Sequence, residues 1–202
     1  MRVAIVGGPG IGKSTLVRQL ADLYHHGSYG EGEKGVWDPR VLDDIAAGRN
    51  PVGVTAYFAR LYDANYRDAA RHDAPDRVMF LEGARITLEA HMAEYPPEYH
   101  EPLRAVLAIG DAWQPDRTIV LTSNTDTIEK HIRQRNRPTE NVEQMVARFR
   151  LIDEAFRRLA PDCPNTVIFN RDHREFHDRR SLLEVIDAAS LPPFEEVPYL
   201  IF

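Results

Sequence analysis

The chain has 202 residues, a hydrophobic content of 43% and a single cysteine, Cys163, which is enough for one domain with a sizeable core and excludes a disulfide framework. Its formal net charge of −6 and sequence pI of about 5.8 argue against tight non-specific binding to a nucleic-acid backbone. No apolar run approaches the roughly 18 residues of a membrane span, and the chain opens on a strand pattern rather than a signal peptide, so we expect a cytoplasmic protein.

The first half of the chain alternates between strand and helix patterns. Residues 2–6 (RVAIV) are mostly apolar and are followed by two glycines, which indicates a buried parallel strand, and a helical pattern begins at Lys13. Residues 25–38 are polar and glycine-rich and are expected to form a loop. The apolar spacing then predicts helices around 41–45 and 54–66, and a second buried strand over 77–83.

The second half repeats this alternation. The patterns predict helices over 85–95, 102–112, 125–137, 141–160 and 181–190, and strands over 117–123 and 165–170. Strands that alternate with helices imply a parallel sheet covered on both faces. The apolar tail FEEVPYLIF is expected either to pack back on the domain or to form a homodimer contact.

The stretch GGPGIGKS fits the phosphate-loop pattern G-x-x-x-x-G-K-[ST], with a strand before it and a helix after it. Its glycines let backbone N–H groups point inward and form an anion nest at a helix N-terminus. Lys13 is predicted to reach the β- and γ-phosphates of ATP, and Ser14 to ligate Mg²⁺. The residues expected to bind ATP in this loop are Gly8, Pro9, Gly10, Ile11, Gly12, Lys13, Ser14 and Thr15.

An acid stands at the end of the second predicted strand, in VMFLEGAR. Ligands of open α/β sheets bind beyond the carboxyl ends of the strands, so Glu82 is predicted to hold Mg²⁺, directly or through water, or to orient the acceptor. A role at a helix N-terminus is the alternative. Arg85 follows within one turn and is expected to bind the acceptor, with a surface ion pair as its alternative.

The segment HIRQRNRPTENVEQ carries Arg133, Arg135 and Arg137. Guanidinium forks bond phosphate oxygens in pairs, and cations on a closing segment stabilise the charge that develops in phosphoryl transfer. We therefore predict a lid around residues 133–142, in which Arg133 and Arg137 close over the transferring phosphate and exclude water, and Arg135 contacts ATP. A solvated basic helix is the alternative.

The order of these motifs resembles the thymidylate kinase and deoxyribonucleoside kinase superfamily of P-loop phosphotransferases. The motifs are the phosphate loop, then LEGAR, then WQPDRTIVLTSNTDTIEKHIRQRNRPTE, then a long helix. The resemblance covers about residues 2–175. It implies an α/β fold, a single-domain P-loop kinase with a five-stranded parallel sheet flanked by helices and an arginine-bearing lid. It also implies ATP with Mg²⁺ as donor, an acceptor cleft between residues 82–85 and the helix at 54–67, and Asp172 of NRDH as an adenine contact.

The acceptor side departs from the family pattern. The family places an arginine directly after the acid of the middle strand, whereas here Gly83 and Ala84 separate Glu82 from Arg85. A hydroxyl acceptor is helped by a general base. In YGEGEKGVWDPR, Glu33 is the first candidate base and Glu31 the second, each with a solvated loop charge as the alternative.

The helix at 54–67 lacks the base-reading glutamine of deoxynucleoside kinases. Arg60, Asp63 or Asn65 are the candidates to read a base edge in its place. Four aromatic residues are candidates to stack on a base: Trp37, Tyr57, Tyr62 and Tyr66. At least two of them are expected to pack in the core instead.

Three functions are weighed from these motifs. The first is a kinase that moves the γ-phosphate of ATP to a (deoxy)nucleoside or nucleoside monophosphate. The second is a phage-type kinase that phosphorylates 5-hydroxymethyluracil in DNA, in a channel lined by Arg40, Arg49, Arg60, Arg67 and Arg71. The third is a regulatory NTP-hydrolysing switch, against which the lack of an Asp-x-x-Gly after a strand counts.

Overall fold

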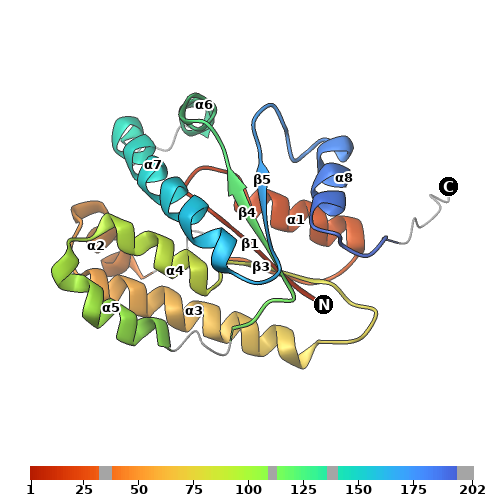
Figure 1. The fold of residues 1–202 in the computed structure, drawn as a ribbon, viewed down its shortest axis with the longest axis horizontal. Coiled ribbons are helices and arrows are strands. Elements are labelled where there is room, and N and C mark those ends of the chain that lie inside the picture. The colour runs from red at the N-terminus through yellow and green to blue at the C-terminus, as the bar shows by residue number, and fades with distance from the viewer. Residues whose placement is uncertain (32–37, 109–112, 136–140, 195–202) are drawn as a thin grey trace.

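The computed structural model describes residues 1–31, 38–108, 113–135 and 141–194, without the side chain of Arg135. Within these residues five strands form one parallel sheet in the order β2-β3-β1-β4-β5, with helices on both faces (Figure 1). The strands are β1 (Arg2–Gly7), β2 (Ser28–Tyr29), β3 (Met79–Glu82), β4 (Arg117–Thr122) and β5 (Thr166–Asn170). The predicted α/β fold with a five-stranded parallel sheet is confirmed.

The described helices connect these strands and follow them. They are α1 (Lys13–Tyr24), α2 (Pro39–Ala47), α3 (Pro51–Arg71), α4 (Arg85–His91), α5 (His100–Leu107), α6 (Thr125–Arg135), α7 (Val142–Leu159) and α8 (Arg179–Ala188), with 3-10 turns η1 (Met92–Glu94), η2 (Pro97–Tyr99) and η4 (Ala160–Asp162). In the part of the chain that the structure describes, none of them has the length and apolar character to span a membrane.

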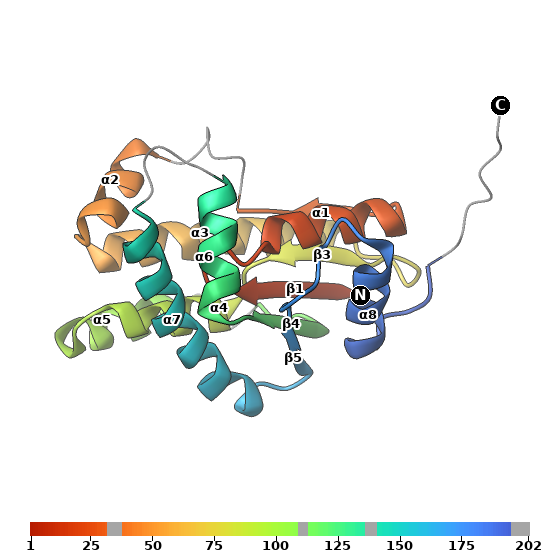
Figure 2. The same ribbon diagram turned by 90° about the horizontal axis from the view of Figure 1, so that it is seen from above.

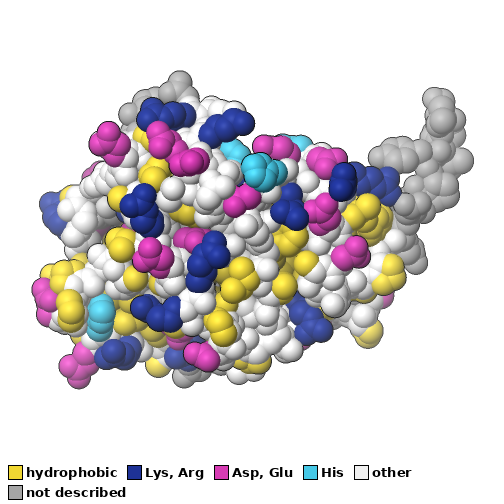
Figure 3. Space-filling model, turned by 45° about the horizontal axis from the view of Figure 1, so that its top comes forward, with side chains coloured by type: hydrophobic (Ala, Val, Ile, Leu, Met, Phe, Trp, Pro, Cys, Tyr) yellow, Lys and Arg dark blue, Asp and Glu magenta, His cyan; other side chains and the backbone are white. Residues whose placement is uncertain are grey.

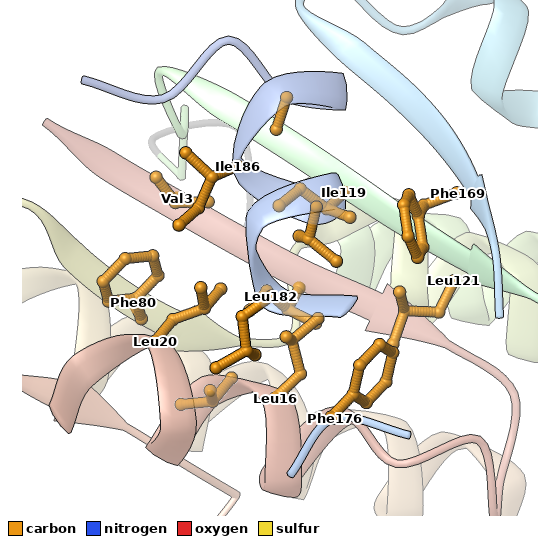
Figure 4. Close-up of a cluster of buried hydrophobic side chains, with 14 of the residues drawn as sticks. Val3, Leu16, Leu20, Phe80, Ile119, Leu121, Phe169, Phe176, Leu182 and Ile186 are labelled. Atoms are coloured by element: carbon orange, nitrogen blue, oxygen red, sulfur yellow. The ribbon is translucent and has the colours of Figure 1, made fainter. Parts of the chain in front are cut away.

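The core lies on both faces of the sheet because successive strand side chains point to opposite sides. Val3 and Ile5 of β1 pack with residues of α1 and α8, as Figure 4 shows for Leu16, Leu182 and their neighbours. Ala4 and Val6 of the same strand pack with residues of α4 and α7. A strand covered on both faces has no polar side to alternate with, which is why the sequence shows it as a continuous apolar run.

The structure differs from the sequence prediction mainly at the sheet edge. The region expected to be one loop, residues 25–38, contains β2, whose two residues pair with Phe80 and Leu81 of β3. A strand of two residues is too short to produce a periodic pattern, so only the family resemblance implied a fifth strand. The helix expected over 85–95 ends at His91 and continues as η1. The tail residues 195–202, with their two predicted roles, lie outside the described residues.

All five strands end at the same edge of the sheet because they are parallel. The phosphate loop follows β1, Glu82 ends β3, Glu31 follows β2 by two residues and Asp172 follows β5. Seen from above, α6 stands beside the carboxyl end of β1 (Figure 2). A Cβ atom placed on Gly10 would accordingly lie 3.1 Å from Ile132 of α6. The topology thus brings the phosphate loop, Glu82, Glu31 and Asp172 to one edge.

Candidate active site

The phosphate loop joins β1 to α1 in a conformation that depends on glycine. Gly12 precedes α1 with a φ of 94°, in the left-handed region that glycine adopts without strain. A Cβ atom on Gly12 would lie 2.4 Å from the guanidinium of Arg171, and one on Gly8 would lie 2.5 Å from the ring of Phe149. Among the described residues no side chain caps the first turn of α1, so its backbone N–H groups can bind an anion.

Lys13 and Ser14 begin α1 and lie between the loop and the end of β3. The Lys13 ammonium donates to the carbonyl of Gly8 at 3.4 Å, and the Ser14 hydroxyl donates to Oε1 of Glu82 at 2.9 Å. Glu82 is only 4% exposed. Burial raises the pKa of the Glu82 carboxyl and the nearby charge of Glu31 adds to the rise, while Lys13 and the Ser14 hydrogen bond oppose it.

The Ser14 hydroxyl and the Glu82 carboxylate fit a magnesium site. Both are oxygen ligands of the kind that Mg²⁺ prefers, and a cation would stabilise the charge of the buried Glu82 carboxylate beside Glu31. No cluster of three or more His, Cys, Asp or Glu side chains that could hold a metal exists among the described residues. Mg²⁺ at phosphate-transfer sites is held by one or two protein oxygens together with the phosphates, so two ligands suffice.

Glu31 is placed directly against Glu82. Its backbone N–H donates to Oε2 of Glu82 at 3.4 Å, so the two acids form one group at the ends of β2 and β3. Glu33, the first candidate for the general base, lies outside the described residues. The second candidate, Glu31, is the one whose position beside the phosphate loop is known.

Tyr62 of α3 completes this group, and its role went unrecognised in the sequence. The Tyr62 hydroxyl donates to Oε1 of Glu31 at 2.5 Å. The ring is buried, as is Tyr66, which confirms that two of the three tyrosines belong to the core. Burial raises the pKa of Tyr62 well above its ordinary value and Glu31 adds to the rise, so the hydroxyl stays protonated as a donor. Its wide spacing from Glu31 in the sequence leaves no local signal for the contact.

Asp63 is engaged by neighbouring side chains. Its Oδ1 accepts a hydrogen bond from the Trp113 indole at 3.2 Å, and its Oδ2 pairs with Arg67 at 2.8 Å. Trp113 is buried and stacks on Tyr66 with ring centroids 6.0 Å apart. These contacts anchor the segment that precedes β4 to α3. The predicted contact of Asp63 with a base edge stays a prediction.

The other predicted acceptor residues are scattered. Arg85 begins α4 and pairs with Glu89 of the same helix at 2.8 Å, the ion pair weighed as its alternative. Arg60 is exposed on α3. Trp37 lies outside the described residues. The structure therefore places Glu82 and Glu31 together, while the acceptor roles of Arg85, Arg60 and Trp37 stay predictions.

The predicted lid is described only at its two ends. Arg133 lies on α6, pairs with Glu129 at 2.6 Å and leaves 61% of its side chain exposed. The side chain of Arg135, the whole of Arg137 and the rest of residues 136–140 lie outside the described part of the chain. The roles of all three arginines in the lid remain predictions.

Asp172 joins the ends of β4 and β5. Its Oδ1 accepts hydrogen bonds from the Ser123 hydroxyl at 2.6 Å and from the backbone N–H of Asn124 at 2.9 Å. Burial by itself would raise the pKa of Asp172, but these hydrogen bonds outweigh it and lower the pKa. Asp172 thus fixes the loop after β5 next to the start of α6. The predicted adenine contact is untested.

Arg171 is a site residue that sequence reasoning missed. Its side chain is 7% exposed and its guanidinium donates to the carbonyl of Ile11 in the phosphate loop. The guanidinium also lies over the Phe176 ring, 4.8 Å from the centroid. It supports the loop from the side of β5. A buried arginine looks like a surface arginine in a sequence, so no pattern could have marked it.

A family model described as an AAA domain matches residues 2–171. The chain belongs to this AAA domain family. The match spans the phosphate loop, the Glu82 strand, the arginine segment and Arg171 of this AAA domain protein. No curated protein sequence matches the chain at a significant level.

Solved structures similar to this AAA domain protein include kinases. Deoxyadenosine kinase from M. mycoides with bound dCTP has a TM-score of 0.67 at 15% identity, covering 93% of this chain and 97% of that one. Thymidylate kinase from Candida albicans has a TM-score of 0.59 at 13% identity, with coverages of 94% and 92%. The NadR protein in complex with NR has a TM-score of 0.58 at 19% identity, and its match covers 98% of this chain but 54% of that one. The fold is therefore that of P-loop nucleoside and nucleotide kinases, as the motifs indicated.

Proposed function

We propose that the chain is an ATP-dependent kinase that transfers the γ-phosphate to a hydroxyl group of a (deoxy)nucleoside. The observation that carries this proposal is the convergence of the phosphate loop, the Ser14–Glu82 hydrogen bond of 2.9 Å and Glu31 at one edge of the sheet. The likeness to deoxyadenosine kinase and thymidylate kinase structures supports a P-loop phosphotransferase.

The acids on the acceptor side favour a hydroxyl acceptor over a phosphate acceptor. The dianionic phosphate of a nucleoside monophosphate would approach two neighbouring carboxylates, those of Glu31 and Glu82, and like charges repel strongly where water is excluded. A hydroxyl acceptor gains from a carboxylate, because its proton must leave as its oxygen attacks phosphorus. A nucleoside monophosphate remains the second candidate, and the experiment below separates the two.

The proposed reaction is an in-line displacement at the γ-phosphorus. Lys13 and the loop N–H groups bind the β- and γ-phosphates, and Ser14 and Glu82 would hold Mg²⁺. When bound, Mg²⁺ neutralises charge on the phosphates. Glu31 accepts the proton of the acceptor hydroxyl while its oxygen bonds to the γ-phosphorus, and the bond to the bridging oxygen of ADP breaks. Arg133 and Arg137 supply positive charge and exclude water.

The DNA-kinase alternative receives no support from the charges. Four of the arginines proposed for a DNA channel pair with aspartates, in Arg40–Asp38, Arg49–Asp44, Arg67–Asp63 and Arg71–Asp68. On the face shown in Figure 3, basic and acidic side chains are interspersed rather than gathered in one basic patch. A channel for single-stranded DNA needs a continuous positive groove, which these pairs neutralise.

The test is an ATP-consumption screen with four deoxynucleosides, their monophosphates and DNA that contains 5-hydroxymethyluracil, with products identified by chromatography. We expect a monophosphate product from at least one nucleoside, and none from the Lys13→Ala variant, which loses the phosphate-binding ammonium. Turnover restricted to monophosphates would reassign the acceptor. ATP hydrolysis at one rate whatever the acceptor would favour the switch instead.

A further inference from the structure

The Tyr62 side chain occupies the space that a side chain on Gly83, the residue after Glu82, would need. A Cβ atom on Gly83 would lie 2.3 Å from Cζ and 2.7 Å from the hydroxyl oxygen of Tyr62. Gly83 also has a φ of 93°, in the left-handed region that side chains disfavour. No residue with a side chain can stand after Glu82 while Tyr62 keeps this place. The glycine of LEGAR is therefore the consequence of a tyrosine contributed by α3.

Gly30 and Glu31, the described residues that follow β2, are held in place by hydrogen bonds from α3 and to Glu82. β2 has two residues, and the chain leaves the sheet directly after it. Asn65 of α3 donates to the carbonyl of Gly30 at 3.0 Å, and Glu82 accepts from the Glu31 N–H at 3.4 Å. Both of these bonds hold backbone. The 2.5 Å bond from Tyr62 holds the Glu31 carboxylate itself.

Tyr62 is also well suited to orient a carboxylate. Its ring is 2% exposed and packs edge-to-face on Trp113, with centroids 5.9 Å apart and planes at 82°. The packing leaves the hydroxyl little freedom, so the direction of its hydrogen bond is set by the fold. Reacting groups must be held within a fraction of an ångström of the productive geometry, and a misplacement of about 1 Å can cost roughly 100-fold in rate.

We infer that Tyr62 is the positioning residue of Glu31, holding its carboxylate toward the acceptor hydroxyl, and that Gly83 provides the space for it. The inference rests on the proposed function, because it gives Glu31 the role of proton acceptor. The residue after Glu82 in LEGAR is a glycine rather than an arginine. The neutral hydroxyl of Tyr62, from α3, lies beside Glu31 instead.

A double-mutant cycle with Tyr62→Phe and Glu31→Gln tests this role. Phenylalanine keeps the ring packing and removes only the hydroxyl. We expect Tyr62→Phe to lower kcat with the best nucleoside about 10- to 100-fold, with the KM for ATP within about 2-fold of wild type. In the Glu31→Gln background the same change should lower kcat less than about 2-fold, because the carboxylate it positions is already absent.

Asn65→Ala is the matched control, because it removes a bond from the same helix to the same segment but to the backbone of Gly30. Its effect on kcat should multiply with that of Glu31→Gln. Melting temperatures are measured for every variant, and assays are run below the lowest of them with saturating ATP to favour the folded state.

The outcomes separate the two proposals. Two results would overturn the positioning role while leaving the nucleoside kinase proposal intact. One is an unchanged kcat in Tyr62→Phe. The other is a fall in kcat from Tyr62→Phe that is as large in the Glu31→Gln background as in the wild type. A wild-type protein that phosphorylates no nucleoside would overturn the proposed function and the role of Tyr62 with it.

Discussion

The Ser14 hydroxyl and the Glu82 carboxylate meet at 2.9 Å although 67 residues of chain separate them, and this contact joins the phosphate loop to the end of β3. Ser14 belongs to the phosphate loop and Glu82 to the end of the neighbouring strand. Burial and Glu31 both raise the pKa of Glu82, so its charge is costly in the absence of a cation.

Glu82→Gln should impair catalysis without impairing folding. The amide is a poor Mg²⁺ ligand, so we expect kcat to fall by about 100-fold or more and the Mg²⁺ concentration for half-maximal rate to rise. The melting temperature should stay equal or rise, because the neutral amide relieves the burial of a charge beside Glu31. Magnesium titrations of the rate and thermal unfolding check both effects. A large fall in melting temperature would show that the charge supports the fold instead.

Arg171→Met should weaken ATP binding. The guanidinium donates to the carbonyl of Ile11, and methionine of similar length cannot replace that hydrogen bond. We expect the Kd for ATP to rise about 10-fold, since hydrogen bonds from charged groups contribute roughly 1.5–3 kcal/mol. Calorimetric titration with ATP measures it. Arg180→Met, which breaks an exposed pair with Glu184 on α8, is the control and should bind ATP as the wild type does. Equal affinities of the two variants would contradict support of the loop by Arg171.

Arg137→Ala should lower kcat more than it raises the KM for ATP. The sequence predicts that Arg137 meets charge that develops on the transferring phosphate, and such an interaction strengthens in the transition state. Steady-state kinetics with the best nucleoside measures both constants, with the exposed Arg180→Ala on α8 as control. A raised KM with an unchanged kcat would assign Arg137 to ATP binding in the ground state.

Glu94→Gln should destabilise the protein at neutral pH. Burial by itself would raise the pKa of Glu94, but hydrogen bonds from His91 and Arg148 outweigh it and hold the pKa at about 2. A carboxyl with a lowered pKa stabilises the folded state above its unfolded pKa of about 4.5, and this contribution disappears as the pH falls toward 2. The shift corresponds to about 3 kcal/mol.

Urea unfolding at pH 7 and at pH 3 measures this difference. The gap between wild type and Glu94→Gln should be largest at pH 7 and shrink at pH 3. Glu98→Gln, at an exposed position nearby, should change little at either pH. A gap that is the same at both values would show that lost packing, rather than lost charge pairing, causes the destabilisation.

Motifs with local physics could be predicted from the sequence. The phosphate loop is contiguous, and its glycines and its Lys13–Ser14 pair act within one turn of chain, so the sequence predicts both its location and the class of ligand it binds. The strand that ends in Glu82 could also be predicted locally, because a strand buried on both faces leaves an uninterrupted apolar run in the sequence. The alternation of strands and helices implied the parallel sheet, and these two features implied the edge at which ligands would bind.

The tertiary structure decided which residues stand beside those motifs. Glu31 meets Glu82 only because β2 pairs with β3, a contact made by two residues that carry no periodicity. Tyr62 and Arg171 look in the sequence like an ordinary core tyrosine and a surface arginine, and packing alone directs one to Glu31 and the other to the phosphate loop. The sequence by itself determined the fold class and the position of the phosphate loop, since both depend on neighbours along the chain. The acceptor side depends on contacts between distant segments, so only the folded chain could assemble it.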